Sequence, residues 1–161
     1  MERMDSVRHL LEMLTSLVSL YSELLGLLLA EKEAIAKWET KEIVEVTKKK
    51  DALLTKEAQL NVARTDLIAQ ISVEYSAPMN KLSDIIDVVR GVDLNLSDEL
   101  ENVGFALVEL VSKISAENLA LRSIYNTNSK LIVDFFSAIG MTSLSGYKTS
   151  INTPPMLQVM G

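Results

Sequence analysis

The fold is decided by residues 5–38, which read DSVRHLLEMLTSLVSLYSELLGLLLAEKEAIAKW. Apolar side chains recur in this stretch at alternating spacings of three and four residues, which places them along one side of an α-helix. Nine of the ten positions in this row are apolar, and the exception is Glu31. The pattern predicts one long helix with a heptad-like seam. The seam consists of Val7, Leu10, Leu14, Leu17, Tyr21, Leu24, Leu28, Glu31, Ile35 and Trp38.

A second apolar row lies beside this seam and is formed by Leu11, Val18 and Leu25. The apolar stripe is therefore wider than a two-stranded coiled coil requires. We expect the first long helix to contact two neighbouring helices rather than one.

The following residues predict a corner and a second long helix over residues 41–75. Thr40 is expected to be its N-cap, with Glu42 favourably placed in the first turn. Three positions of its seam are charged, so the apolar stripe is narrow and we expect this helix to be the most exposed. We also expect the lysine run 48–50 to lie on a solvated helix face. The charged seam positions are Lys50, Glu57 and Arg64.

Breaks in the pattern divide the remainder of the chain. Residues 76–78, Ser-Ala-Pro, interrupt the second helix, and a short helix is expected over 80–90, ended by Gly91. Ser97 is expected to cap a last long helix that runs to about residue 139.

Short connections between long helices make consecutive helices antiparallel. The predicted fold is therefore all-α. It is an elongated antiparallel helical bundle or coiled coil of three long helices plus one short helix, over residues 1–140. Residues 141–161 are expected to form a flexible, partly apolar C-terminal tail.

The composition argues against catalysis. The 161 residues include no cysteine and one histidine, which excludes thiolate sites and makes histidine-dependent triads or multi-histidine metal sites improbable. The six glycines are scattered and form no phosphate-binding loop. A net charge of −6 disfavours binding to nucleic acid. We expect no enzymatic activity, no metal and no cofactor.

The apolar stretch 10–30 requires a check against membrane insertion. Glu12 and Glu23 interrupt it, whereas a membrane-spanning helix needs about 20 predominantly apolar residues. A signal peptide is disfavoured because Glu2 and Asp5 stand where a positive region is required. We expect a cytoplasmic protein without stable membrane insertion.

The end of the last helix is apolar on more than one face, over residues 131–139. A helix of that kind is either buried or binds something. If it extends beyond its own bundle, it offers an apolar surface to an amphipathic partner helix. The alternative is that the first two long helices cover it, and the sequence leaves both possibilities open.

The whole pattern resembles the FlgN family of flagellar export chaperones, over about residues 5–150. A leucine-rich opening helix is followed by a Lys/Glu-rich helix, with the corner 38–43, WETKEI, between them. A late-helix signature that reads roughly Asn-x-x-Asn-x-x-Leu-Ile in the family is matched with tyrosine in place of the first asparagine. A tyrosine follows in the polar tail, without the usual glycine after it. The matching residues are Tyr125, Asn128, Leu131, Ile132 and Tyr147.

This resemblance implies a chaperone that binds the C-terminal amphipathic helices of hook-filament junction proteins of the FlgK and FlgL type. It would deliver them to the flagellar type III export apparatus. Tyr147 is expected to contact the export gate. The expected partner contacts are Leu121, Tyr125, Asn128, Leu131, Ile132, Phe135, Phe136 and Ile139.

The alternative interpretation is a structural or scaffold coiled-coil protein. Such a protein would use the same apolar surface for self-association and would form a stable homo-oligomer. The sequence does not decide the oligomeric state.

Overall fold

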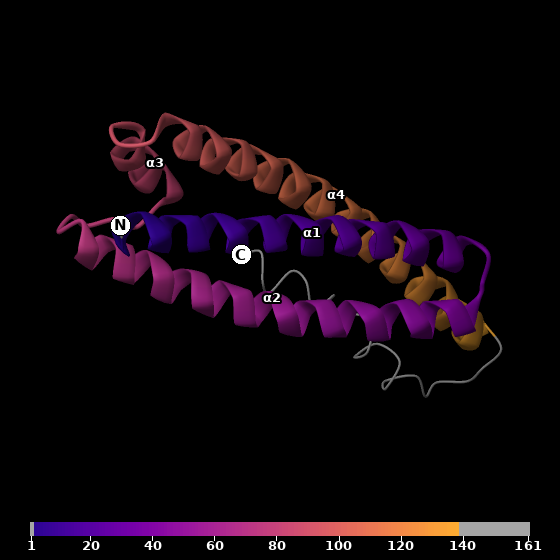
Figure 1. Ribbon diagram of the computed structural model, residues 1–161. Coiled ribbons are helices and arrows are strands. Elements are labelled where there is room, and N and C mark those ends of the chain that lie inside the picture. Colours follow the sequence, from indigo (N-terminus) through magenta and orange to yellow (C-terminus); the bar gives the residue numbers. More distant parts are fainter. Residues whose placement is uncertain (1, 139–161) are drawn as a thin grey trace.

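The computed structural model describes residues 2–138, with the side chains of residues 4–127 and of Lys130. It contains four helices in the order α1 (Glu2–Ala36), α2 (Thr40–Glu74), α3 (Leu82–Arg90) and α4 (Leu94–Ala138), as Figure 1 shows. No strand occurs within this described range. The prediction of an all-α fold with three long helices and one short helix is confirmed.

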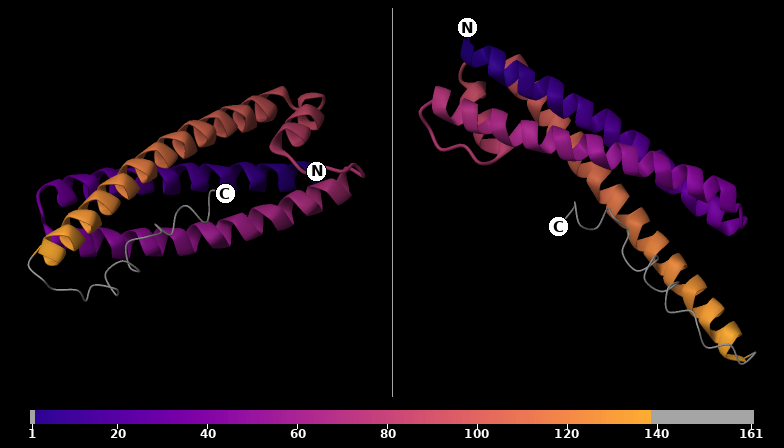
Figure 2. Two further views of the ribbon diagram at one scale, coloured as in Figure 1. Left: turned by 180° about the vertical axis from the view of Figure 1, so that it is seen from behind. Right: turned by 90° about the horizontal axis from the view of Figure 1, so that it is seen from below.

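Helix α1 is the central element, because α2 and α4 both pack against it and have little contact with each other. Helix α2 returns antiparallel to α1, and α4 then runs antiparallel to α2 and therefore parallel to α1 (Figures 1 and 2). The short helix α3 packs against the first part of α4. The expectation that the first long helix has two neighbours is therefore confirmed.

The core is divided into two clusters along α1. The first joins α1 to the end of α2, to α3 and to the beginning of α4, and it includes Leu10, Ile71, Ile85 and Leu100. The second lies toward the corner between α1 and α2, and it joins α1 to α2 and to the middle of α4. Its most buried members are Leu24, Leu28, Ile114 and Leu121.

Two predicted helix caps are wrong. Helix α2 already includes Thr40 as its first residue, and its N-cap is Glu39, which makes no side-chain capping bond. Helix α4 begins three residues before Ser97, because Asp93 Oδ1 accepts a hydrogen bond from the backbone N–H of Leu96 at 3.1 Å. Ser97 is instead fully buried inside the helix.

The expectation that the lysine run 48–50 lies on a solvated helix face is wrong for Lys50. Lys50 and Glu57 are buried, with exposed fractions of 7% and 3%. Each has a polar partner on α1 that offsets the removal of water from its charge. The lysine run 48–50 therefore points one of its three charges into the protein.

Helix α1 is long and apolar enough, over Met4–Ala36, to cross a membrane by length and composition alone. The core helix of a bundle passes the same test. In this structure the seam of α1 is buried against α2 and α4, and 28% of the apolar window as a whole is buried.

Candidate functional site

The first candidate surface is the C-terminal part of α4. This helix has 45 residues, ten more than α1 or α2. It remains packed against α1 as far as Tyr125, the last α4 residue described in the second core cluster. The right-hand view of Figure 2 shows the end of α4 diverging from the α1–α2 pair. At about 1.5 Å per residue, the thirteen residues from Asn126 to Ala138 extend this helix by roughly 20 Å.

A polar cluster anchors α4 where this extension begins. Tyr125 donates a hydrogen bond to Glu31 Oε1 of α1 at 2.5 Å, and Lys50 Nζ of α2 lies 2.6 Å from Glu31 Oε2. The Lys50 and Glu31 side chains are only 8% and 2% exposed. Burial raises the pKa of Tyr125 well above its ordinary value, and the hydrogen bond and negative charge of Glu31 raise it further. The Glu31 carboxylate thereby joins three helices at one point.

A second polar cluster lies further along the α1–α2 interface. Tyr21 donates to Glu57 Oε1 at 2.7 Å, and Asn61 Nδ2 donates to the same oxygen at 3.1 Å. Burial, followed by the bond to Glu57, raises the pKa of Tyr21 to about 12. Both tyrosines therefore remain neutral donors at physiological pH, and these clusters position helices rather than transfer protons.

The structure separates the predicted contact residues into three groups. Leu121 is 1% exposed and belongs to the core, and Tyr125 is half-buried with its hydroxyl on Glu31. Five further residues lie on α4 where its backbone alone is described, and two lie outside the described residues. The five are Asn128, Leu131, Ile132, Phe135 and Phe136, and the two are Ile139 and Tyr147.

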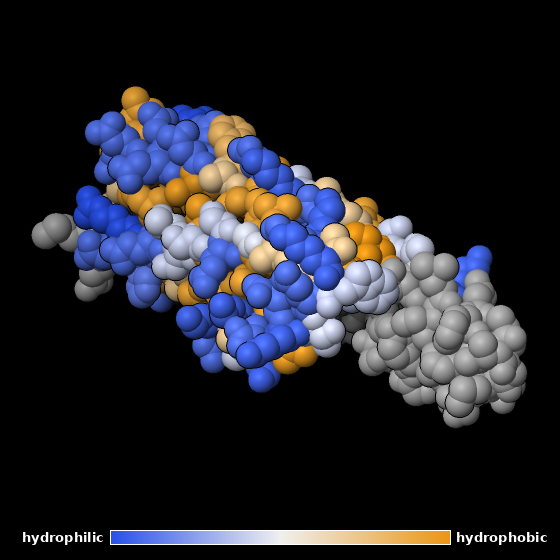
Figure 3. Space-filling view, turned by 90° about the vertical axis from the view of Figure 1, so that its right-hand side faces the viewer, coloured by the Kyte–Doolittle hydropathy of each residue, from blue (hydrophilic) through white to orange (hydrophobic). Residues whose placement is uncertain are grey.

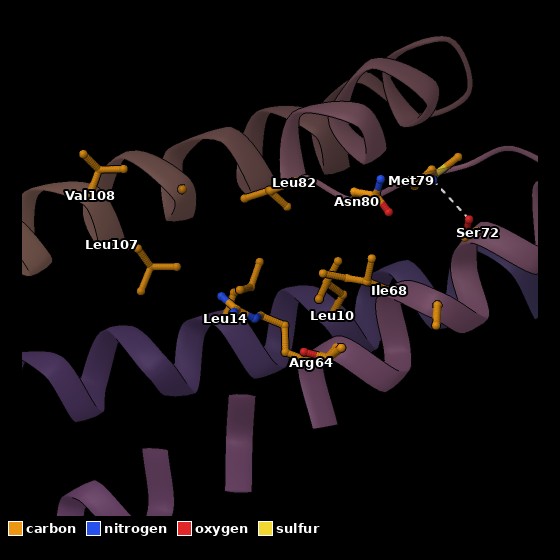
Figure 4. Close-up of a pocket in the computed structure, with 13 residues that line it drawn as sticks. Leu10, Leu14, Arg64, Ile68, Ser72, Met79, Asn80, Leu82, Leu107 and Val108 are labelled. Carbon is orange, nitrogen blue, oxygen red and sulfur yellow. Dashed lines mark hydrogen bonds between the residues drawn. The ribbon is translucent and has the colours of Figure 1, made fainter. Parts of the chain in front are cut away.

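A groove that sequence reasoning missed lies at the other end of the molecule, between α2 and α4. It has a volume of about 630 Å³ and is floored by Leu10 and Leu14 of α1 (Figure 4). Arg64 and Ile68 line its α2 side, and Leu107 lies on its α4 side. The available signal was Arg64, one of the three charged positions in the seam of α2.

Exposed apolar side chains are distributed over the outer faces of the helices. On the face shown in Figure 3, apolar residues form an interrupted band between hydrophilic ones. On α4, Phe105, Val108 and Leu119 are 64%, 67% and 58% exposed. Their spacing places them on one side of the helix, away from the α1 contact.

The chemistry of these surfaces is that of packing between helices. No group of three or more potential metal ligands occurs among the residues that the structure describes. What the described region offers is apolar helix faces with a few placed charges, which is how proteins recognise amphipathic helices. The fold and these surfaces are those of a small helical-bundle protein with exposed apolar helix faces.

A comparison with protein families identifies the family to which this helical-bundle protein belongs. The family model of the FlgN proteins matches residues 1–143, and the chain belongs to the FlgN family. It is thus a member of a family of flagellar export chaperones. No curated protein and no solved structure matches the chain.

Proposed function

We propose that this protein is a cytoplasmic chaperone for hook-filament junction proteins of the FlgK and FlgL type. It binds their C-terminal amphipathic helices, prevents their premature association and delivers them to the flagellar export apparatus. Membership of the FlgN family supports a chaperone role in flagellar export. The choice of junction proteins as cargo rests on the resemblance described above.

The observation behind the proposed docking surface is the extension of α4 beyond its last described contact with α1. In that extension the sequence places Leu131, Ile132, Phe135 and Phe136 on more than one side of the helix. An apolar helix end of this kind gives temporary cover to an amphipathic helix that is later buried in the assembled filament. Leu121 and Tyr125 then serve as the packed base of this surface, and Tyr147 remains the proposed contact for the export gate.

The test is co-expression of the chain with the FlgK-type and FlgL-type proteins of its own organism, with the mass of any complex measured by light scattering. We expect a discrete complex that is lost when the C-terminal helices of the partner are removed. A chain that elutes as a stable homo-oligomer without binding either protein would support the scaffold alternative instead.

Point variants locate the surface. Phe136→Asp should leave the helical circular dichroism spectrum unchanged and abolish the complex, because a charge enters an apolar contact. Val62→Asp is the matched control, since Val62 is 63% exposed on the outer side of α2 and lies outside the proposed surface. Loss of helicity in Phe136→Asp would place this side chain in the core of the bundle.

A further inference from the structure

The groove between α2 and α4 is open for an architectural reason. Helix α1 packs against both of these helices, but they do not close against each other. Three helices arranged in this way leave vacant the position that a fourth helix occupies in a four-helix bundle. Leu14, Leu107 and Val108 line the vacant position, as Figure 4 shows.

Arg64 is the one charged residue that lines this groove. It is half-buried, and its side chain extends toward Leu14 (Figure 4). Among the described side chains, no carboxylate forms an ion pair with it. The positive charge of Arg64 acts against the rise in the pKa of Tyr21. A guanidinium beside apolar groups such as Leu14 and Ile68 is suited to a bidentate carboxylate delivered by a partner.

The positive charge of Arg64 also determines which kind of chain can occupy the groove. Residues 139–161 of the chain contain nine apolar side chains but no aspartate or glutamate, so none of their side chains offers Arg64 a carboxylate. An amphipathic helix with an acidic residue at the edge of its apolar stripe satisfies both the apolar lining and Arg64.

We propose that the groove receives one amphipathic helix of the exported protein, with its apolar stripe on Leu14, Leu107 and Val108 and a carboxylate on Arg64. This inference rests on the proposed function, and it adds a second contact to the end of α4. Residues 107 and 138 are separated by about 45 Å along α4. The cargo therefore binds through two segments, or through one long helix that reaches both surfaces.

The test measures binding of the full chain to one probe, the isolated C-terminal helical segment of the FlgK-type protein from the same organism. Arg64→Glu is expected to raise the Kd at least about 10-fold, because it places two carboxylates together in a water-poor contact. Val108→Glu is expected to act similarly, and it should fold normally because Val108 is 67% exposed. Lys56→Glu, an exposed charge reversal on α2, is the matched control and should leave the Kd within about 2-fold.

A rescue experiment identifies the carboxylate. Each acidic residue of the probe is changed to lysine in turn, and one change should restore most of the binding to Arg64→Glu while weakening binding to the unaltered chain. If both groove variants bind normally and Phe136→Asp does not, the groove proposal is wrong and the proposed function stands. If the unaltered chain does not bind the probe, the choice of cargo is wrong and the groove proposal falls with it. A chain that forms a dimer which Arg64→Glu dissociates would show a second copy in the groove, which also overturns the proposal.

Discussion

The carboxylate of Glu31 uses both of its oxygens. Oε2 faces Lys50 Nζ of α2 at 2.6 Å, and Oε1 accepts the hydroxyl of Tyr125 of α4 at 2.5 Å. Removing two charges from water is costly, and their attraction offsets this cost only when the geometry is good and the remaining lone pairs are occupied. We infer that this cluster determines which parts of the three helices meet, rather than adding much net stability.

A double-mutant cycle tests this inference. Glu31→Leu or Lys50→Met alone should lower the free energy of unfolding by about 3–5 kcal/mol, because each leaves a buried charge without its partner. The double variant Glu31→Leu with Lys50→Met should recover most of this loss. Urea unfolding followed by circular dichroism measures all four proteins. Single variants that each cost less than about 1 kcal/mol would show that water reaches the pair.

Tyr21 makes the free energy of unfolding depend on pH in the alkaline range. Its pKa is raised to about 12 in the folded protein, above the ordinary value of 10.0. The unfolded chain therefore loses the phenolic proton first, so the stabilisation is complete below pH 10 and declines as the pH rises toward 12. Between pH 9 and 11, the free energy of unfolding should fall less in Tyr21→Phe than in the unaltered protein. Equal slopes in urea titrations of the two proteins would contradict this assignment.

At the scale of the helix, α1 contains a glycine that packing does not explain. Gly26 is exposed within α1, and a Cβ at this position would meet nothing within 4 Å. Gly26→Ala should therefore raise the free energy of unfolding by about 0.5–1 kcal/mol through helix propensity alone. Thermal and urea unfolding provide the measurement.

Gly104 on α4 provides the comparison. A Cβ there would lie 3.2 Å from Leu82 Cδ2, so the gain in helix propensity is partly offset by the displacement of that side chain. Gly104→Ala should stabilise the protein less than Gly26→Ala. The reverse order would mean that α1 requires the flexibility of Gly26.

The long helices could be predicted because their apolar seams repeat over many turns. The caps were less predictable, because Asp93 and Ser97 are both good capping residues and lie four positions apart. The burial of Lys50 was missed because the lysine run was judged on its own helix. A comparison of the α1 and α2 seams would have predicted this burial, because the seam of α1 carries the opposite charge at Glu31.

The two candidate surfaces also differ in whether the sequence alone predicts them. The apolar end of α4 is a local property of the sequence and could be predicted from it. The groove is not local, because it depends on how far α2 and α4 are held apart by α1. No periodicity along one helix contains that spacing, so only the assembled helices reveal it.

At the scale of the molecule, the bundle is an open layer organised around α1 rather than a closed four-helix bundle. Helix α4 is held by α1 along the stretch that includes Leu100, Ile114 and Leu121. Beyond Tyr125 no described side chain belongs to either core cluster. The bundle and the end of α4 should therefore respond differently to truncation.

A chain ending at residue 128 should retain the stability of the bundle to within about 1 kcal/mol, because it keeps Leu121, Ile124 and Tyr125 in the second cluster. The same chain should lose binding to the junction proteins, because it lacks the apolar end of α4. A chain ending at residue 117 is the matched comparison, and it should lose at least about 2–5 kcal/mol through the removal of Leu121 alone. Urea unfolding and co-purification of the three lengths separate the two roles of α4. Equal destabilisation by both truncations would mean that residues beyond 128 belong to the core, and the docking surface would then have to be sought elsewhere on the bundle.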